Sequence, residues 1–406
     1  VNEAGFSRPF CLEQYMKRLP PTVVMLGLVS LLMDAASELL HSLLPLFLTV
    51  TLGASMATVG LIQGAAEATA ALTKVFSGAW SDHRHQRKPM IVLGYGLAAL
   101  SKPLFPLASS AFAVFVARCI DRVGKGIRGA PRDALIADIT PPAQRGAAFS
   151  LRQALDTLGA VLGPLLAWLL LGGLLLEVRS VMWLAVLPAA LALLLLLFAV
   201  REPERAPADP AASAPLSLAA LRLVPLRLWL GLTLAALLAK GQFSDAFLIL
   251  RMQDLGWQAA QAPLTLVLLN LVYAAAAYPA GLLADRIGAS RLLALGWGLL
   301  CVAYLLLAAA TTPWVGLAGV VLVGLYMALT QGLMAAQVAN MAPATMRGTM
   351  FGLFNLLCGA ILLLLNALGG WLWQLAGPAP MFAVGAAMTL LALFGVRYLP
   401  QLTRQQ

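Results

Sequence analysis

Long apolar runs separated by short polar breaks recur along the whole chain, as at residues 181–200, 292–310 and 361–375. Each run is close to the ~20 residues that cross the hydrocarbon core of a bilayer. In lipid every backbone amide must be paired internally, and the runs are too long and too rich in Leu and Ala for the strands of a membrane barrel. The pattern therefore predicts an all-α membrane protein. The twelve predicted transmembrane helices, six in each half, cover residues 20–50, 55–81, 88–109, 111–138, 147–173, 178–200, 226–250, 260–284, 290–310, 314–340, 349–370 and 378–399.

Two motifs occur once in each half of the chain. The stretch 281–291 has an imperfect copy at 78–88, and the stretch 339–353 matches 137–151. Both matches have nearly the same offset, about 200 residues, and internal symmetry of this kind is common in membrane carriers. We therefore predict two pseudo-symmetric bundles of six helices. The predicted parts are an N-terminal bundle at 1–200, a polar, proline-rich cytoplasmic linker at 201–225 and a C-terminal bundle at 226–406.

Composition and charge narrow the class of protein. Hydrophobic residues make up 61% and charged residues 11% of the 406 residues, so a soluble domain of this composition would expose large apolar patches. Most Lys and Arg residues that flank the predicted helices lie on the side of the termini, with Arg179 and Arg251 opposite, which places both termini in the cytoplasm. The net charge of +10 comes from flanking and intramembrane residues rather than from a nucleic-acid surface. We expect a monomeric, multi-pass protein of a bacterial inner membrane, in contact with lipid and without a nucleic-acid partner.

Ionisable residues inside the predicted helices are costly in lipid and mark functional positions. Asp34, Glu38 and His41 follow the spacing i, i+4, i+7, which places them on one face of the first helix, and Glu67 lies near the middle of the second. Two carboxylates one turn apart repel each other in a medium of low dielectric constant, which favours proton uptake by one of them. A structural ion pair is an equal alternative for any single carboxylate. For the group, with Asp121 of the fourth helix as a further candidate, we favour proton coupling.

The fourth predicted helix carries a row of cations. At 100° per residue, Arg118, Arg122, Lys125 and Arg132 fall within an arc of about 80°. One interpretation is a binding site for an anion, because guanidinium groups bind carboxylate and phosphate. The other is internal neutralisation by acidic residues of neighbouring helices. Pro131 and the glycines near it predict a kink or an unwound turn in this helix.

The second half has few intramembrane charges. Lys240 and Asp245 on the seventh predicted helix are candidate substrate-binding residues, and the first half contributes further candidates. These are His41, Arg118, Arg122 and Lys125. The remaining polar positions of the second half are mostly neutral, namely Gln242, Ser244, Asn270, Tyr273, Tyr326, Gln331, Gln337, Asn355 and Asn366. Any one Asn or Gln more often forms a hydrogen bond between helices than belongs to a substrate-binding site. The asymmetry predicts that the first half handles protons and the second offers a partly apolar wall to the substrate.

The repeated charged motif resembles the signature of the major facilitator superfamily, Gly-x-x-x-Asp-Arg/Lys-x-Gly-x-Arg/Lys-Arg/Lys, which lies between helices two and three and again between helices eight and nine. The second copy fits at Gly281, Asp285, Arg286, Gly288 and Arg291. The first copy fits at Gly78, Asp82, Arg87 and Lys88, whereas His83 and His85 replace the expected basic residue and glycine. The glycine of the motif permits close approach of helices. The resemblance covers the whole chain and implies that these contacts stabilise an outward-facing state and break as the protein opens inward.

Two shorter elements extend the resemblance. Gly159-Ala-Val-Leu-Gly163-Pro164 resembles an element of the drug/proton antiporters of this superfamily, and small residues four apart also allow tight helix packing. Arg122-x-x-x-Gly126 resembles an element linked to proton coupling. The candidate gating residues are Gly78, Asp82, Arg145, Gly159, Gly163, Pro164, Gly281, Asp285, Arg286 and Arg347.

Together these patterns predict a secondary transporter that works by alternating access, and proton-coupled efflux of a small organic molecule is the favoured hypothesis. Uptake or exchange of an organic anion, and lipid flipping, are alternatives that the sequence leaves open. Catalysis is not expected, because the sequence has no Ser-His-Asp arrangement, metal-ligand spacing or phosphate-binding loop. We expect no metal and no cofactor, with the proton gradient as the energy source.

Overall fold

The computed structural model describes residues 19–84, 87–141, 144–202, 226–341 and 347–396, and every regular element in them is a helix. Side chains at 78–84, 227, 240, 285, 289, 332–341, 347–349, 351 and 396 lie outside the description. The all-α class is confirmed for the described residues. The number of membrane crossings, the side of the termini and the division of the chain at 201–225 stay predictions.

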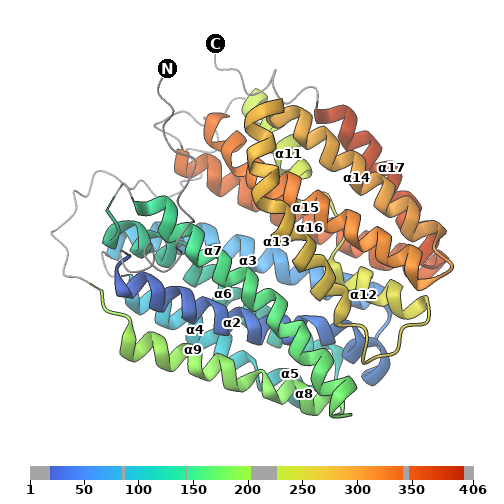
Figure 1. Cartoon of the computed structure of the whole chain (residues 1–406), viewed down its shortest axis with the longest axis horizontal. Helices are drawn as coiled ribbons and strands as arrows, with labels where there is room; N and C mark the ends of the chain where they lie inside the picture. The colour runs from blue at the N-terminus through green and yellow to red at the C-terminus, as the bar shows by residue number, and fades with distance from the viewer. Residues whose placement is uncertain (1–18, 85–86, 142–143, 203–225, 342–346, 397–406) are drawn as a thin grey trace, which may run out of the picture.

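The helices of each half lie together (Figure 1). The first half contains α2 (Pro21–Leu46) with the π-helical turn η1 (Phe47–Thr51), α3 (Met56–Arg84), α4 (Lys88–Ser101), α5 (Leu104–Leu107), α6 (Ala111–Ile139), α7 (Arg145–Trp168) with the π-helical turn η3 (Leu169–Gly173), α8 (Val178–Leu184) and α9 (Val186–Ala199). The second half contains α11 (Leu226–Lys240), α12 (Asp245–Asp254), α13 (Leu264–Ile287), α14 (Ala289–Ala309), α15 (Pro313–Met341), α16 (Arg347–Ala376) and α17 (Pro378–Val396). The halves meet mainly where α3 packs on α16 and α7 packs on α13.

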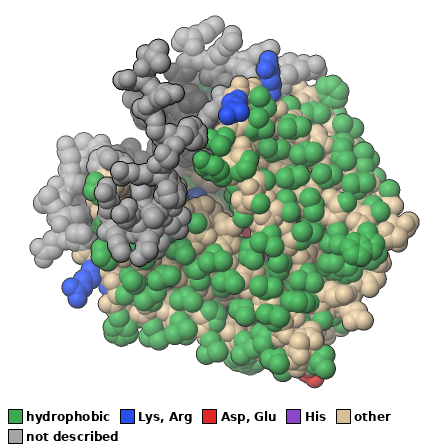
Figure 2. Space-filling view, viewed as in Figure 1, with side chains coloured by type: hydrophobic (Ala, Val, Ile, Leu, Met, Phe, Trp, Pro, Cys, Tyr) green, Lys and Arg blue, Asp and Glu red, His purple; other side chains and the backbone are tan. Residues whose placement is uncertain are grey.

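The outer surface is apolar, as a surface in lipid must be. Nine helical stretches of the described chain are long and apolar enough to cross a membrane. Helices α3 and α6 are not among them, because they carry charged residues such as Glu67 and Arg122. Large apolar side chains such as Phe112, Phe198 and Trp314 are exposed, and apolar side chains cover most of the visible surface (Figure 2).

The seventh predicted helix, 226–250, is wrong as a single element. It is divided into α11 and α12 by an irregular segment at 241–244. The amide groups released by this break are paired by side chains from other helices, because Phe243 N donates to the Tyr304 hydroxyl (2.9 Å) and Ser244 N donates to Asn366 Oδ1 (2.7 Å). The Ser244 hydroxyl then accepts from Ala246 N at the start of α12. Irregular backbone within a membrane needs such partners, and they are distant in sequence.

The predicted unwound turn at Pro131 is also wrong, since α6 is helical without interruption from Ala111 to Ile139. Proline removes one backbone hydrogen bond, but packing on both sides of α6 keeps the remaining turns. A methyl group on Gly124 would lie 2.5 Å from Gly94 O of α4, and one on Gly126 would lie 2.9 Å from Ala70 O of α3. These two glycines therefore allow close contact of helices, and a kink near Pro131 stays a prediction.

Close packing predicted for Gly159 and Gly163 is confirmed. A methyl group on Gly159 would lie 2.5 Å from Leu31 O, and one on Gly163 would lie 2.5 Å from Ala35 O. Pro164 beside them is buried. Helix α7 thus lies directly against the part of α2 that carries the predicted acidic residues.

The bundle has two ends. We call the end with the turns at Gly53, Gly256 and Gly377 the Gly53 face, and the end where α3 finishes at Arg84 and α13 at Ile287 the Arg84 face. In Figure 1 the short helices α5, α8 and α12 mark the Gly53 face.

A seam of glycines joins the two halves on the side of the Gly53 face. A methyl group on Gly60 of α3 would overlap the carbonyl oxygen of Asn366 on α16, and one on Gly370 of α16 would overlap that of Met56 on α3. Between them, a methyl group on Gly64 would lie 2.8 Å from Leu363 Cα. The backbones of α3 and α16 are therefore in contact, and no larger residue fits at these positions without separating the helices.

Replacing Gly60 by Ala should destabilise this conformation, because the added methyl group meets a backbone oxygen that cannot move alone. Overpacking of this kind costs about 1–3 kcal/mol. Gly96→Ala is the matched control, because a methyl group there meets nothing within 4 Å and alanine favours the helix. Melting temperatures in detergent compare the two variants. If Gly60→Ala melts no lower than Gly96→Ala, α3 and α16 are not in this contact in solution.

Candidate functional site

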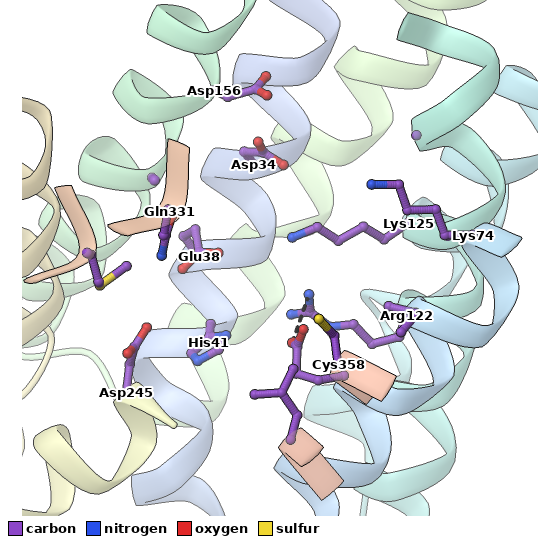
Figure 3. Close-up of a pocket in the computed structure, with 18 of the residues that line it drawn as sticks. Asp34, Glu38, His41, Lys74, Arg122, Lys125, Asp156, Asp245, Gln331 and Cys358 are labelled. Carbon is purple, nitrogen blue, oxygen red and sulfur yellow. Dashed lines mark ion pairs between the residues drawn. The ribbon is translucent and has the colours of Figure 1, made fainter. Parts of the chain in front are cut away.

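A cavity of about 730 Å³ lies between the two halves. Helices α2, α3, α6 and α7 form one wall, and residues of α11, α12, α13, α15 and α16 form the other (Figure 3). Its size is within the range of sites for small organic molecules. The cavity is therefore the candidate functional site.

The two walls differ sharply in charge. The wall from the first half carries the five carboxylates Asp34, Glu38, Glu67, Asp133 and Asp156 and the six cations Lys74, Arg122, Lys125, Arg128, Arg132 and Arg152. The wall from the second half contributes Asp245 as its one charged group among the side chains described. The predicted asymmetry between the halves is thus present at the cavity itself.

Most cations of the first wall are neutralised by a carboxylate on a neighbouring helix. Arg122 contacts Glu67 of α3 (Nη1–Oε1 3.3 Å), and Arg128 contacts Asp34 of α2 (Nη2–Oδ1 3.4 Å). Farther towards the Arg84 face, two arginines share two carboxylates of α6 and α7. Those contacts are Arg132–Asp133 at 3.2 Å, Arg132–Asp156 at 3.9 Å, Arg152–Asp133 at 3.6 Å and Arg152–Asp156 at 2.9 Å. Internal neutralisation, one of the two interpretations of the cationic row, therefore accounts for most of it.

Three charged side chains at the cavity are exceptions. Lys74, Lys125 and Glu38 form no ion pair with any residue that the structure describes, and both lysine side chains are exposed to the cavity. In Figure 3, Lys125 extends from α6 towards the side of the cavity where α2 carries Glu38. These groups can therefore bind a ligand or a proton without first breaking an ion pair.

A second group of charges lies behind this wall. Arg118 does not line the cavity; its Nη2 donates to His41 Nδ1 (2.8 Å) and to Gln63 Oε1 (3.3 Å). Asp121 is likewise buried away from the cavity and accepts from Lys102 Nζ at 2.7 Å. The assignments of Arg118 to substrate and of Asp121 to protons therefore stay predictions, without direct access to the cavity in this conformation.

The buried group is joined to the cavity wall through shared partners. Lys102 Nζ also donates to Ser37 Oγ of α2 (2.8 Å), and Arg122 Nε approaches Asp121 Oδ2 at 3.8 Å. The Arg128 guanidinium lies over the Tyr95 ring, 4.4 Å from its centroid. Each buried charge thus has a partner on another helix, which fixes α2, α4 and α6 relative to one another.

The wall from the second half is apolar and neutral. Phe243, Leu266, Met327, Phe354 and Leu362 provide its apolar surface. The neutral polar residues at the cavity are Gln242, Ser244, Asn270, Tyr273, Gln331, Asn355 and Asn366. Tyr326 is instead buried against Trp297, and the side chain of Gln337 lies outside the described residues. Some of these amides also connect helices, since Asn270 Nδ2 donates to Ala160 O of α7 (2.9 Å).

The predicted gating residues fall into different situations. Only the helical backbone is described at Gly78, Asp82, Asp285 and Arg347, and the same holds for the substrate candidate Lys240. Arg145 Nε donates to Ala137 O (3.1 Å) and Thr140 O (3.4 Å), so it caps the end of α6. Arg286 is exposed.

The expected close contact at Gly281 is wrong for this conformation, because a methyl group there would meet no described atom within 4 Å. The motif glycine with a conformational role is Gly288. Its φ of +87° and its N–H bond to Ala284 O (3.0 Å) end α13 before α14 begins. In the first copy, Arg87 forms an ion pair with Asp138 of α6 (2.8 Å), which ties helix ends within the first half.

Sequence reasoning missed Gln63 and Tyr95. Gln63 lies four residues before Glu67 and therefore on the same face of α3, a spacing that could have revealed it. Tyr95 gave no such signal, because it lies in an apolar stretch and its role depends on Arg128 and Arg132 of α6. No group of side chains suited to a metal ion is present among the described residues. What the arrangement can do is bind a small polar molecule and exchange protons at carboxylates.

Comparison with known proteins shows which family this chain resembles. A family model described as Major Facilitator Superfamily matches residues 26–250 and 228–405. An uncharacterized MFS-type transporter from Methanocaldococcus jannaschii is 29% identical over 386 residues, covering 93% of this chain and 94% of the relative. The multidrug resistance protein MdtH of Photorhabdus laumondii is 39% identical over 97 residues, or 24% of each chain. A crystal structure of the nucleoside transporter NupG has a TM-score of 0.71 at 14% identity, covering 94% of this chain and 100% of that one, which is a likeness of fold.

Replacing Asp121 by Asn tests whether this residue is structural. The change leaves the buried Lys102 ammonium without its carboxylate, and breaking a buried pair in this way costs about 3–5 kcal/mol. Asp133→Asn is the matched control, because that side chain is 41% exposed and such pairs contribute about 0–1 kcal/mol. Thermal unfolding in detergent measures both. An Asp121→Asn protein that melts like the native one but loses pH-driven transport would instead assign Asp121 to proton coupling.

Proposed function

The chain belongs to the Major Facilitator Superfamily of transporters, since the family model matches both of its halves, and on this premise we propose that it exports a small organic molecule in exchange for protons. The match of about a quarter of the chain to a multidrug resistance protein supports the outward direction. The finer statements, which concern the substrate, the protons and the direction, rest on the geometry of the cavity.

The observation that carries the proposal is a pair of carboxylates one helical turn apart on α2, both at the cavity wall. Asp34 is bound to Arg128 of α6, so a proton on Asp34 would remove a link between two helices. Glu38 forms no ion pair with a described residue, so it can take up a proton without breaking one. Proton binding at this pair would therefore change both the charge of the cavity and the connection between α2 and α6.

Exchange requires that protons and substrate compete for the same groups. A hydrogen-bond donor or a positive group on the substrate would lie against ionised Glu38, and protonation of Glu38 would remove that attraction. The seam of α3 and α16 joins the halves on the side of the Gly53 face, and on the Arg84 side a methyl group on Gly281 would meet no described atom within 4 Å. We therefore assign loading of substrate to the Arg84 face, which the distribution of Lys and Arg predicts to be cytoplasmic.

Glu38→Gln and Asp34→Asn test the proton sites. An amide resembles a protonated carboxyl group, so each variant should keep exchange of substrate for substrate and lose transport driven by a pH gradient. Counterflow and proton flux in proteoliposomes measure the two activities, with a substrate selected by a thermal-shift screen of drugs, sugars and organic acids. Glu177→Gln, an exposed carboxylate on the Gly53 face, is the control and should behave as the native protein. Unchanged pH-driven transport in both α2 variants would remove this assignment.

Cotransport of an organic anion is the second candidate, and Lys74 and Lys125 favour it. Both ammonium groups are exposed to the cavity without an ion-pair partner among the described residues. An anion bound by Lys125 would compete with ionised Glu38, so protonation of Glu38 would promote anion binding. Proton and anion would then move in the same direction, which is the opposite coupling sign to the exchange mechanism.

The coupling sign separates the two functions. If the substrate is an anion held by Lys125, Lys125→Gln should weaken binding at least about tenfold, which is the loss of one interaction of about 1.4 kcal/mol. Arg179→Gln is the control, because Arg179 Nη2 donates to Ala108 O (3.3 Å), away from the cavity. Titration calorimetry with benzoate and phthalate measures affinity, and internal pH during transport gives the sign. Unaltered affinity in Lys125→Gln would exclude this lysine as the anion site.

A further inference from the structure

The hydrogen bond between Arg118 and His41 determines the state of the histidine ring. Arg118 Nη2 lies 2.8 Å from His41 Nδ1. A guanidinium group has donors and no acceptor, so Nδ1 must be the acceptor in this bond and must carry no hydrogen. The ring is then neutral, and its only N–H is at Nε2.

Arg118 is itself held firmly in this position. It is 1% exposed, its Nη2 also donates to Gln63 Oε1 (3.3 Å), and its Nη1 lies 4.0 Å from Asp121 Oδ2. Asp121 in turn is bound to Lys102. Because Gln63 lies on α3 and Asp121 on α6, the guanidinium cannot turn away from His41 without losing both of these buried contacts.

The other nitrogen of the ring, Nε2, is buried without a hydrogen-bond partner among the described residues, at the wall of the cavity. A buried donor that stays unpaired costs about 1–3 kcal/mol. The charged groups that face the ring are Glu38 on α2, Glu67 on α3, Arg118, Arg122 and Lys125 on α6, and Asp245 on α12, which packs against α2. The ring therefore lies where a molecule in the cavity could complete its hydrogen bonding.

We propose that His41 recognises the substrate as a neutral hydrogen-bond donor, held in the Nε2–H tautomer by Arg118 as a positioning residue. The group that it binds is an acceptor oxygen of the substrate, such as a carboxylate, carbonyl or phosphoryl oxygen. His41 does not carry the coupling proton, because a proton on Nδ1 would break the bond to Arg118 and place two cations in contact. The part that concerns the substrate rests on the proposed transport function, whereas the tautomer does not.

Nitrogen NMR of the histidine side chain tests the tautomer directly. The chain has three histidines, so His83→Gln together with His85→Gln leaves His41 as the single signal from protein labelled with ¹⁵N-histidine. We expect one protonated nitrogen, Nε2, and no change in the ring shifts between about pH 8 and pH 5, the range in which a free histidine titrates. A doubly protonated ring, or a hydrogen on Nδ1, would overturn the proposal whatever the transport activity.

Three further measurements examine the roles of Arg118 and of the substrate. Arg118→Met should release the ring, so that the His41 signal titrates within this range. If that variant does not fold, the native spectrum alone decides. Benzoate, uridine and sulfate are probes that differ in shape and share acceptor oxygens. In protein that retains Arg118, at least one of them should shift the Nε2–H signal of His41 downfield. If none of the three probes shifts the Nε2–H signal, the proposed contact with substrate is wrong. In a transport assay, His41→Gln, which keeps a hydrogen-bond donor, should be more active than His41→Leu.

Discussion

The requirement that every charge buried in a membrane has a partner determines most of this structure. Six cations and five carboxylates line one wall of the cavity, and further charges lie behind it. An isolated ion in such surroundings would be too costly, so α2, α3, α4, α6 and α7 must keep the positions that bring the opposite charges together. Lys102, Asp121 and Arg118 show the principle, since each contacts a residue on another helix or turn. Ion pairs and hydrogen bonds between charged side chains therefore hold the helices of the first half together.

The wall that the second half contributes to the cavity is of a different kind. It offers Phe243, Phe354 and neutral amides, with Asp245 as the described exception. A wall without ion networks can adapt to molecules of different shape, because apolar contacts are not directional. The broken helix α11–α12 fits this division, since its free amides are satisfied by Tyr304 and Asn366 and leave an irregular segment at the cavity. The two walls of the cavity therefore differ in kind, since one is built mainly from ion pairs and the other mainly from apolar and neutral side chains.

Much of this arrangement could be predicted from the sequence, and the limits have physical reasons. Apolar runs located the helices, and the spacing of Asp34, Glu38 and His41 placed all three at the cavity. Periodicity on α6 identified the cations, but it could not separate Arg118, which is turned towards His41 and Gln63, from Arg122, which reaches the cavity. That difference depends on how neighbouring helices approach α6. The break after Lys240 was missed for a similar reason, because the groups that stabilise it come from α14 and α16.

The seam between α3 and α16 has a consequence for the speed of the transport cycle. At Gly60, Gly64 and Gly370 the contacts are with backbone atoms of the facing helix, and Met56 N donates one hydrogen bond to Gln374 Oε1. Because these contacts involve backbone atoms and no ionisable side chain, their strength should not depend on pH. The carboxylates proposed as proton sites, Glu38 and Asp34, lie elsewhere, on α2. In the proposed mechanism the seam and the proton sites are thus separate parts of the protein. A substitution at a seam glycine should therefore change the rate of opening while the pH dependence of transport stays the same.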